Sequence, residues 1–101
     1  MSLDYACQVF FAAVQDAVTS EQPLRKRAEQ LCSASIDKLR GDEPLREDLV
    51  ERIAQIRKTR ARLREMRDSE VQDLLTEVVR VYDALACQLY STGQTKATGA
   101  R

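Results

Sequence analysis

The sequence predicts an all-α protein, an antiparallel bundle of three to four helices, and three observations support this fold class. Glycine occurs 3 times and proline 2 times in 101 residues, which is too few for an all-β chain, where turns recur about every 8–12 residues. Apolar residues recur at intervals of three and four along most of the chain. The composition, 44% hydrophobic and 32% charged, is typical of a soluble folded chain.

The length is that of a single domain, to which we assign residues 1–90. Residues 91–101 lack apolar periodicity and are rich in small and polar residues. We therefore expect them to form a disordered C-terminal tail.

The first predicted helix, residues 3–19, has an apolar face of roughly 200°, wider than the stripe by which a helix usually faces one core. It should therefore be buried against more than one neighbour, or against a partner.

Helix-start and helix-stop signals then divide the chain. Ser20 has the character of an N-cap for a second helix over 21–40. Gly41 is expected to end that helix, and Asp42 to cap a third helix over 43–67.

A fourth helix is predicted over 69–90, where Ser69 and Gln72 have the spacing of a capping box. Its apolar residues follow a regular four-three spacing.

Charges around position 68 predict how the third and fourth helices pair. Three basic residues precede this point and three acidic residues mirror them after it, so that folding the chain back would bring each pair together. The expected pairs are Arg67 with Glu70, Arg64 with Asp73, and Arg60 with Glu77.

The same contacts could form between two copies of one continuous helix over 43–90, paired across a two-fold axis. The sequence leaves this alternative to the hairpin open.

The first and fourth helices both have apolar faces wider than one neighbour requires, which favours self-association or docking to a partner helix. The alternative explanation is that the bundle itself buries these faces. The residues expected in the core or at an interface are Phe10, Phe11, Val14, Val78, Tyr82 and Leu85.

The stretch 57–67 contains six basic residues and one acid, and it is the strongest local charge feature. It could contact phosphates or an acidic partner, or be a solvated face whose charges pair with the acids that follow. The zero net charge and the lack of interleaved aromatic residues favour the second interpretation. The candidate contact residues are Arg57, Arg60, Arg64 and Arg67.

No catalytic, cofactor or metal site is expected. The chain has no histidine and no glycine-rich phosphate loop, and its cysteines, Cys7, Cys32 and Cys87, lack metal-binding spacing. An odd, scattered set of cysteines, together with the absence of a recognisable signal peptide or membrane span, predicts a cytoplasmic protein.

The function expected from these features is that of a non-enzymatic helical interaction module, such as an adaptor, chaperone or assembly subunit. It would act through its broad apolar helix faces, by forming a homodimer or a complex with another protein. The alternative is a nucleic-acid-associated regulatory protein that uses the basic stretch 57–67.

Overall fold

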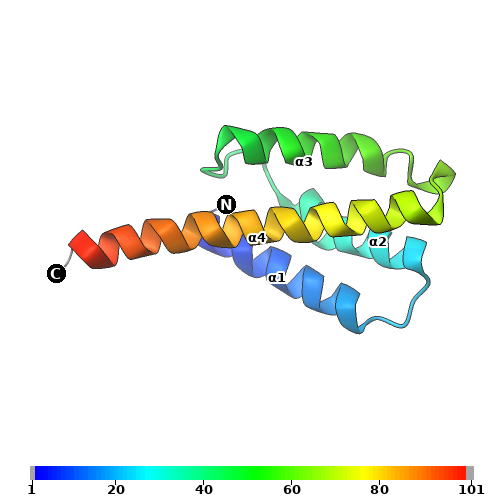
Figure 1. Ribbon diagram of the computed structural model, residues 1–101, viewed down its shortest axis with the longest axis horizontal. Helices are drawn as coiled ribbons and strands as arrows, with labels where there is room; N and C mark the ends of the chain where they lie inside the picture. Colours follow the sequence, from blue (N-terminus) through cyan, green and yellow to red (C-terminus); the bar gives the residue numbers. More distant parts are fainter. Residues whose placement is uncertain (1, 100–101) are drawn as a thin grey trace.

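The computed structural model describes residues 2–99, and side chains from residue 2 to residue 91. The described chain forms four α-helices and two short 3₁₀ turns. They are α1 (Leu3–Thr19), α2 (Leu24–Ala34), η1 (Ile36–Lys38), α3 (Glu47–Arg60), η2 (Leu63–Glu65) and α4 (Asp68–Gly99). Consecutive helices run in opposite directions (Figure 1). The predicted all-α antiparallel bundle is therefore confirmed, with four helices in one chain.

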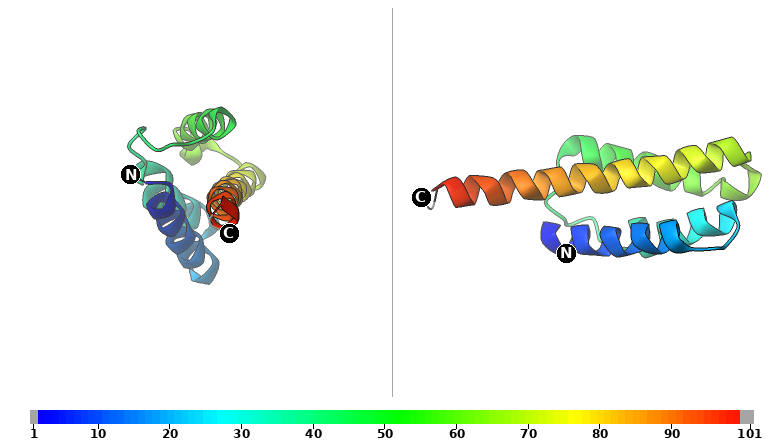
Figure 2. Two further views of the ribbon diagram at one scale, coloured as in Figure 1. Left: turned by 90° about the vertical axis from the view of Figure 1, so that its left-hand side faces the viewer. Right: turned by 60° about the horizontal axis from the view of Figure 1, so that its bottom comes forward.

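Helix α4 is the centre of the bundle. It packs against α1, α2 and α3, and α1 also packs against α2. Seen along the bundle, α1, α2 and α4 form a triangular group, with α3 lying outside it (Figure 2). The last turns of α4 extend past the other helices (Figure 1).

One hydrophobic core joins the four helices, and each contributes residues at the three-four spacing that the sequence predicted. Phe10 of α1, Leu31 of α2, Ile56 of α3, and Val78 and Leu85 of α4 are almost fully buried. Because a fully buried aliphatic or aromatic side chain contributes about 1.5–3 kcal/mol, this cluster is the main source of the bundle's stability.

Helix α2 begins three residues later than predicted. The Ser20 hydroxyl accepts a hydrogen bond from the Gln22 backbone N–H (3.1 Å), a local turn that competes with helix formation. Pro23 takes the N-cap position, and its carbonyl accepts the first helical bond, from the Arg27 N–H (2.9 Å). The predicted capping role of Ser20 is therefore wrong.

Helix α2 also ends earlier than predicted, at Ala34. The buried Ser35 hydroxyl donates a hydrogen bond to the Leu31 carbonyl (2.5 Å), the group that a continuing helix would offer to the Ser35 N–H. The 3₁₀ turn η1 follows, and its first residue, Ile36, is buried in the core.

The turn before α3 is closed by Glu43 rather than by Asp42. The Glu43 carboxylate accepts hydrogen bonds from the backbone N–H groups of Arg40 (2.8 Å) and Gly41 (2.9 Å). Gly41 has a φ of +96°, in the left-handed region that glycine adopts without strain. Helix α3 starts four residues later than predicted, with Arg46 as its N-cap residue, so the predicted cap at Asp42 is wrong.

Helices α3 and α4 form an intrachain hairpin, and the alternative of one continuous helix over 43–90 is wrong. Helix α3 ends at Arg60, and η2 lies within the connection to α4. The Arg25 side chain of α2 holds this connection by donating to the carbonyls of Leu63 and Met66, at 2.7 Å for Met66.

The register of the hairpin differs from the mirrored charge pattern. Glu77 pairs with Arg52 (2.8 Å), two helical turns before the predicted partner Arg60, because the connection takes up residues that were assigned to the third helix. The Glu70 carboxylate accepts the backbone N–H of Arg67 (3.1 Å). This bond caps α4, which begins at Asp68, one residue before the predicted start. Ser69 therefore lies within the helix, and its predicted capping role is wrong.

The predicted tail over 91–101 lies largely outside the described side chains. The backbone of α4 continues as a helix to Gly99, whereas residues 100 and 101 are not described. Disorder of the tail stays a prediction.

Candidate functional site

The six residues expected in the core or at an interface fall into two groups. Phe10, Val78 and Leu85 are fully buried and belong to the core. Phe11 is 48% exposed, and Val14 and Tyr82 are half-buried. The second group lies on one side of the core, where α1 meets α4.

A second apolar row runs beside the core on each of these two helices, and we call the two rows together the apolar stripe. It consists of Phe11, Val14 and Val18 on α1, and Leu75, Val79 and Tyr82 on α4. Within each row the spacing is three and four residues, which places its members on one helix face.

The antiparallel packing of α1 and α4 joins the two rows. The helices lie side by side on the same face of the bundle (Figure 2). The Phe11 and Tyr82 rings are in contact, with centroids 6.1 Å apart and planes tilted by 40°. From this contact, antiparallel register sets Val14 opposite Val79, and Val18 opposite Leu75.

A groove of about 270 Å³ opens in the stripe next to the ring pair. Val14 and Val18 form one wall and Leu75 and Val79 the other, and Leu31 and Arg27 of α2 also line it. The lining is therefore apolar apart from the side chains of Arg27 and Thr76.

Solvent exposure distinguishes the stripe from the core. Val18 is 74% exposed and Val79 is 41% exposed, although both lie in regular helices. Single exposed apolar residues are normal on protein surfaces, but a contiguous row on two adjacent helices is typical of a contact surface.

Arg27 is the one basic side chain that lines the groove. Its Nε atom is buried and has no hydrogen-bond partner among the described residues. A buried donor without a partner costs about 1–3 kcal/mol, so a ligand or partner that supplied an acceptor would recover this loss.

Two of the four candidate arginines make contacts within the bundle. Arg57 donates to the carbonyls of Ile36 (3.2 Å) and Leu39 (3.5 Å), which belong to the chain around η1. Arg60 donates to the Asp37 carboxylate and to the Ser33 hydroxyl (3.0 Å for Ser33). These contacts attach the end of α3 to the chain around η1.

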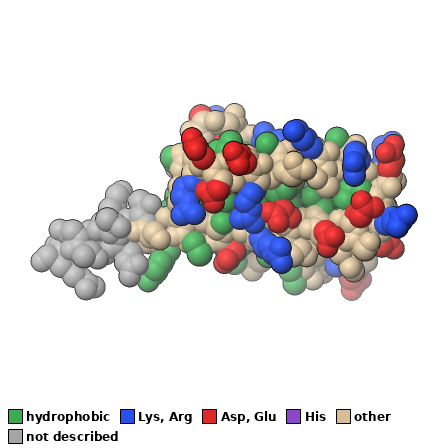
Figure 3. Space-filling view, turned by 45° about the horizontal axis from the view of Figure 1, so that its top comes forward, with side chains coloured by type: hydrophobic (Ala, Val, Ile, Leu, Met, Phe, Trp, Pro, Cys, Tyr) green, Lys and Arg blue, Asp and Glu red, His purple; other side chains and the backbone are tan. Residues whose placement is uncertain are grey.

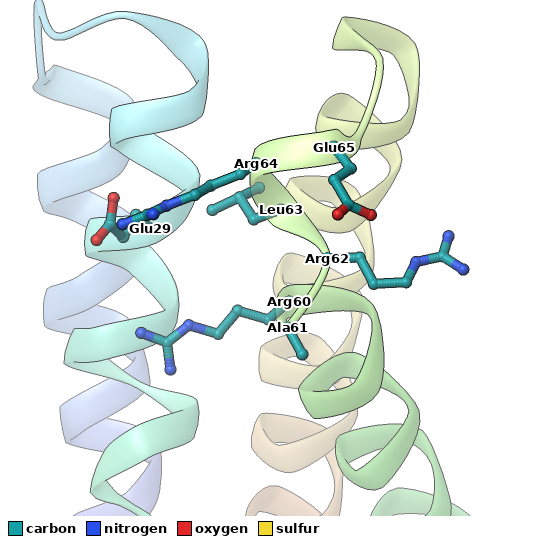
Figure 4. Close-up of a pocket in the computed structure, with 7 residues that line it drawn as sticks. All are labelled: Glu29, Arg60, Ala61, Arg62, Leu63, Arg64 and Glu65. Atoms are coloured by element: carbon teal, nitrogen blue, oxygen red, sulfur yellow. The ribbon is translucent and has the colours of Figure 1, made fainter.

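The remaining candidates are Arg64, which shares a pocket with Arg60, and Arg67, which does not line that pocket. Arg60, Arg62 and Arg64 line a pocket of about 250 Å³ together with Glu29 and Glu65. Within it, Arg64 extends toward Glu29 of α2, whereas Arg62 points in the opposite direction (Figure 4).

Arg67 lies outside this pocket, just before α4, and its backbone N–H donates a hydrogen bond to the Glu70 carboxylate. The basic stretch is therefore distributed around the η2 connection and mixed with acids.

The cysteines do not form a cluster. Cys7 and Cys32 are buried and Cys87 is exposed, and all three are free thiols. Burial, offset in part by the nearby Arg60 guanidinium, raises the pKa of Cys32 to about 11, so this thiol stays protonated near neutral pH.

Two other kinds of feature are absent from the described residues. No group of three or more Cys, Asp or Glu side chains is placed to hold a metal ion. Nor does any described helix have the length and apolar content needed to span a membrane.

Sequence reasoning found the two helices of the stripe but missed several of its members. Val18, Leu75 and Val79 lie next to predicted residues at helical spacing, so the signal was present in the periodicity. Arg27 gave no such signal, because its position beside the groove depends on how α2 packs beneath α1 and α4.

Comparisons with protein-family models, with curated proteins and with solved structures found no match to this chain.

Proposed function

We propose that this protein is a non-enzymatic helical interaction module, an adaptor, chaperone or assembly subunit, whose contact surface is the apolar stripe between α1 and α4. The observation that carries the proposal is the exposure of Phe11, Val18 and Val79 in one contiguous surface. Burying an exposed valine or phenylalanine side chain contributes about 1.5–3 kcal/mol, so covering the stripe supplies a substantial driving force for association.

The shape of the stripe favours a helical partner. Its two rows have the three-four spacing of coiled-coil positions, and an amphipathic helix laid into an apolar groove makes contacts at the same spacing. The complete absence of histidine from the sequence removes the commonest general base, which supports a role in binding rather than in catalysis.

We place this function in the cytoplasm. The three free thiols are in keeping with a reducing compartment.

The nucleic-acid alternative has less support. Arg57 and Arg60 donate to groups within the bundle, so they have fewer donors left for phosphates. On the face formed by α3 and α4, basic and acidic side chains are interspersed rather than separated (Figure 3). Nucleic-acid-binding surfaces usually concentrate basic charge.

Retention of binding partners by a tagged protein tests the proposal. The bait would be the wild type, Val18→Asp in the stripe, and Val50→Asp as the matched control, because Val50 is an exposed valine (52%) on α3. Each would be incubated with an extract of the source cells and with an untagged copy of the chain.

We expect the wild type and Val50→Asp to retain the same proteins and Val18→Asp to lose them. Equal retention by Val18→Asp and the wild type, or no specific retention by any bait, would contradict the proposal.

A further inference from the structure

The apolar stripe carries opposite charges toward its two ends. Arg27 lies at the end formed by Val18 and Leu75. Asp83 follows Tyr82 at the other end, and it is exposed. Neither side chain forms a hydrogen bond or an ion pair within the part of the chain that the structure describes.

The two charges lie nearly symmetrically about the middle of the stripe. Arg27 shares the groove with Thr76, which is seven residues before Asp83 on α4. Two turns of helix rise about 10.5 Å, and Val79 lies close to the midpoint. A half-turn about an axis through this point would therefore exchange the basic end with the acidic end.

Two of the side chains that flank the stripe are uncharged. Gln15 follows Phe11 by four residues on α1, and Gln72 precedes Val79 by seven on α4, so both flank the rows. Both side chains are exposed and uncharged, so they do not repel an identical surface.

We propose that the occupant of the apolar stripe is a second copy of this chain, bound antiparallel about a two-fold axis near Val79. The inference rests on the proposed function, and it adds the identity and orientation of the partner. In this dimer the stripe of one copy packs on the stripe of the other, and the Arg27 guanidinium of each copy meets the partner's Asp83 carboxylate.

The dimer accounts for a feature that the single chain leaves unexplained. The partner's Asp83 supplies acceptor oxygens to the Arg27 side chain, whose Nε lacks a hydrogen-bond partner, in the charge-assisted geometry that arginine and carboxylate favour. A two-fold interface is also self-complementary, because one patch serves both sides. Two chains then form four helices around the shared stripe, two α1 and two α4.

A charge exchange tests both the partner and the orientation. Arg27→Glu and Asp83→Arg each place like charges at both ends of the interface when the variant pairs with itself. When the two variants are mixed, each end of the mixed dimer again carries opposite charges. Lys58→Glu and Glu51→Arg, at exposed positions on α3, are the matched controls.

Sedimentation equilibrium and native mass spectrometry would follow association, and circular dichroism would check the helicity of each variant. We expect the wild type and both controls to reach twice the monomer mass of 11.5 kDa. Each interface variant alone should dissociate at least about ten-fold more readily, a change of about 1.4 kcal/mol. The equimolar mixture should recover wild-type affinity as a mixed dimer. If a charge reversal lowers helicity, Arg27→Gln and Asp83→Asn should each weaken the wild-type dimer instead.

Three outcomes would overturn the inference. A wild type that stays monomeric at all concentrations would exclude a second copy; the proposed function would still stand if Val18→Asp abolished retention of another protein. Variants that dimerise as well as the wild type would place the dimer interface elsewhere. A mixture that stays monomeric, while the wild type dimerises, would exclude the antiparallel orientation.

Discussion

The Glu43 carboxylate lies almost entirely inside the turn between η1 and α3, with only 9% of the residue exposed. Desolvation alone would raise its pKa, but the hydrogen bonds from the backbone N–H groups of Arg40 and Gly41 outweigh desolvation and lower the pKa below its ordinary value of about 4.5. A carboxylate whose pKa is depressed on folding stabilises the folded state above its unfolded pKa. That contribution is lost as the pH falls through the folded-state pKa.

The consequence is a pH-dependent effect of Glu43→Gln on stability. At pH 7 the free energy of unfolding of the variant should be about 1–2 kcal/mol lower than that of the wild type, because hydrogen bonds to a charged group are lost. This difference in the free energy of unfolding should shrink once the pH falls below about 4.5. The wild-type carboxyl then becomes protonated and is uncharged, like the glutamine side chain of the variant. Urea unfolding between pH 7 and pH 3 measures this, with Glu51→Gln on α3 as the control. A difference that stays constant over this range would contradict the assigned role of the Glu43 charge.

The same turn shows why residue-level prediction was incomplete. The sequence correctly indicated a chain reversal at Gly41, because few residues other than glycine adopt a positive φ. Helix-cap statistics pointed to Asp42 as the acid that closes it. Which of two adjacent acids turns inward depends on the path of the chain from η1 to α3, and no local pattern specifies that path.

At the scale of the elements, the connection between α3 and α4 sets the register of the hairpin. The mirrored charges around position 68 correctly predicted that the chain reverses there, but the side-chain ion pairs they indicated do not form among the described residues. Exposed ion pairs contribute only about 0–1 kcal/mol, so they do not determine the register against core packing. Burial of Leu63 and Met66 and the hydrogen bonds from Arg25 to their carbonyls favour the observed connection.

Arg25→Met should therefore destabilise the protein through this connection. Loss of its charge-assisted hydrogen bonds should lower the free energy of unfolding by about 1.5–3 kcal/mol. Lys26→Met, at the exposed neighbouring position, should change it by no more than about 0.5 kcal/mol. Urea unfolding measures both, and hydrogen exchange should be faster in residues 61–67 of the Arg25 variant. Equal unfolding midpoints for the two variants would show that Arg25 does not hold the connection.

At the scale of the whole molecule, periodicity was enough to predict the bundle and its core. Phe10, Val78 and Leu85 follow the three-four spacing and are fully buried, as the spacing indicates. Whether Phe11 and Tyr82 would be covered could not be predicted, because that depends on how closely α3 approaches α1. In the structure α3 packs chiefly on α4, which leaves the stripe on α1 and α4 without a neighbouring helix.

The central claim is that association covers the apolar stripe, and hydroxyl-radical footprinting measures that coverage directly. Phe11 and Tyr82 report on the stripe, Tyr5 (55% exposed) is a reference for the solvent, and Phe10 (0% exposed) is a reference for the core. Oxidation would be compared between dilute protein and protein that is concentrated or bound to the proteins it retains. We predict that Phe11 and Tyr82 become protected on association while oxidation of Tyr5 is unchanged. Equal oxidation of Phe11 and Tyr82 in the dilute and associated samples would contradict the assignment of the stripe as the contact surface.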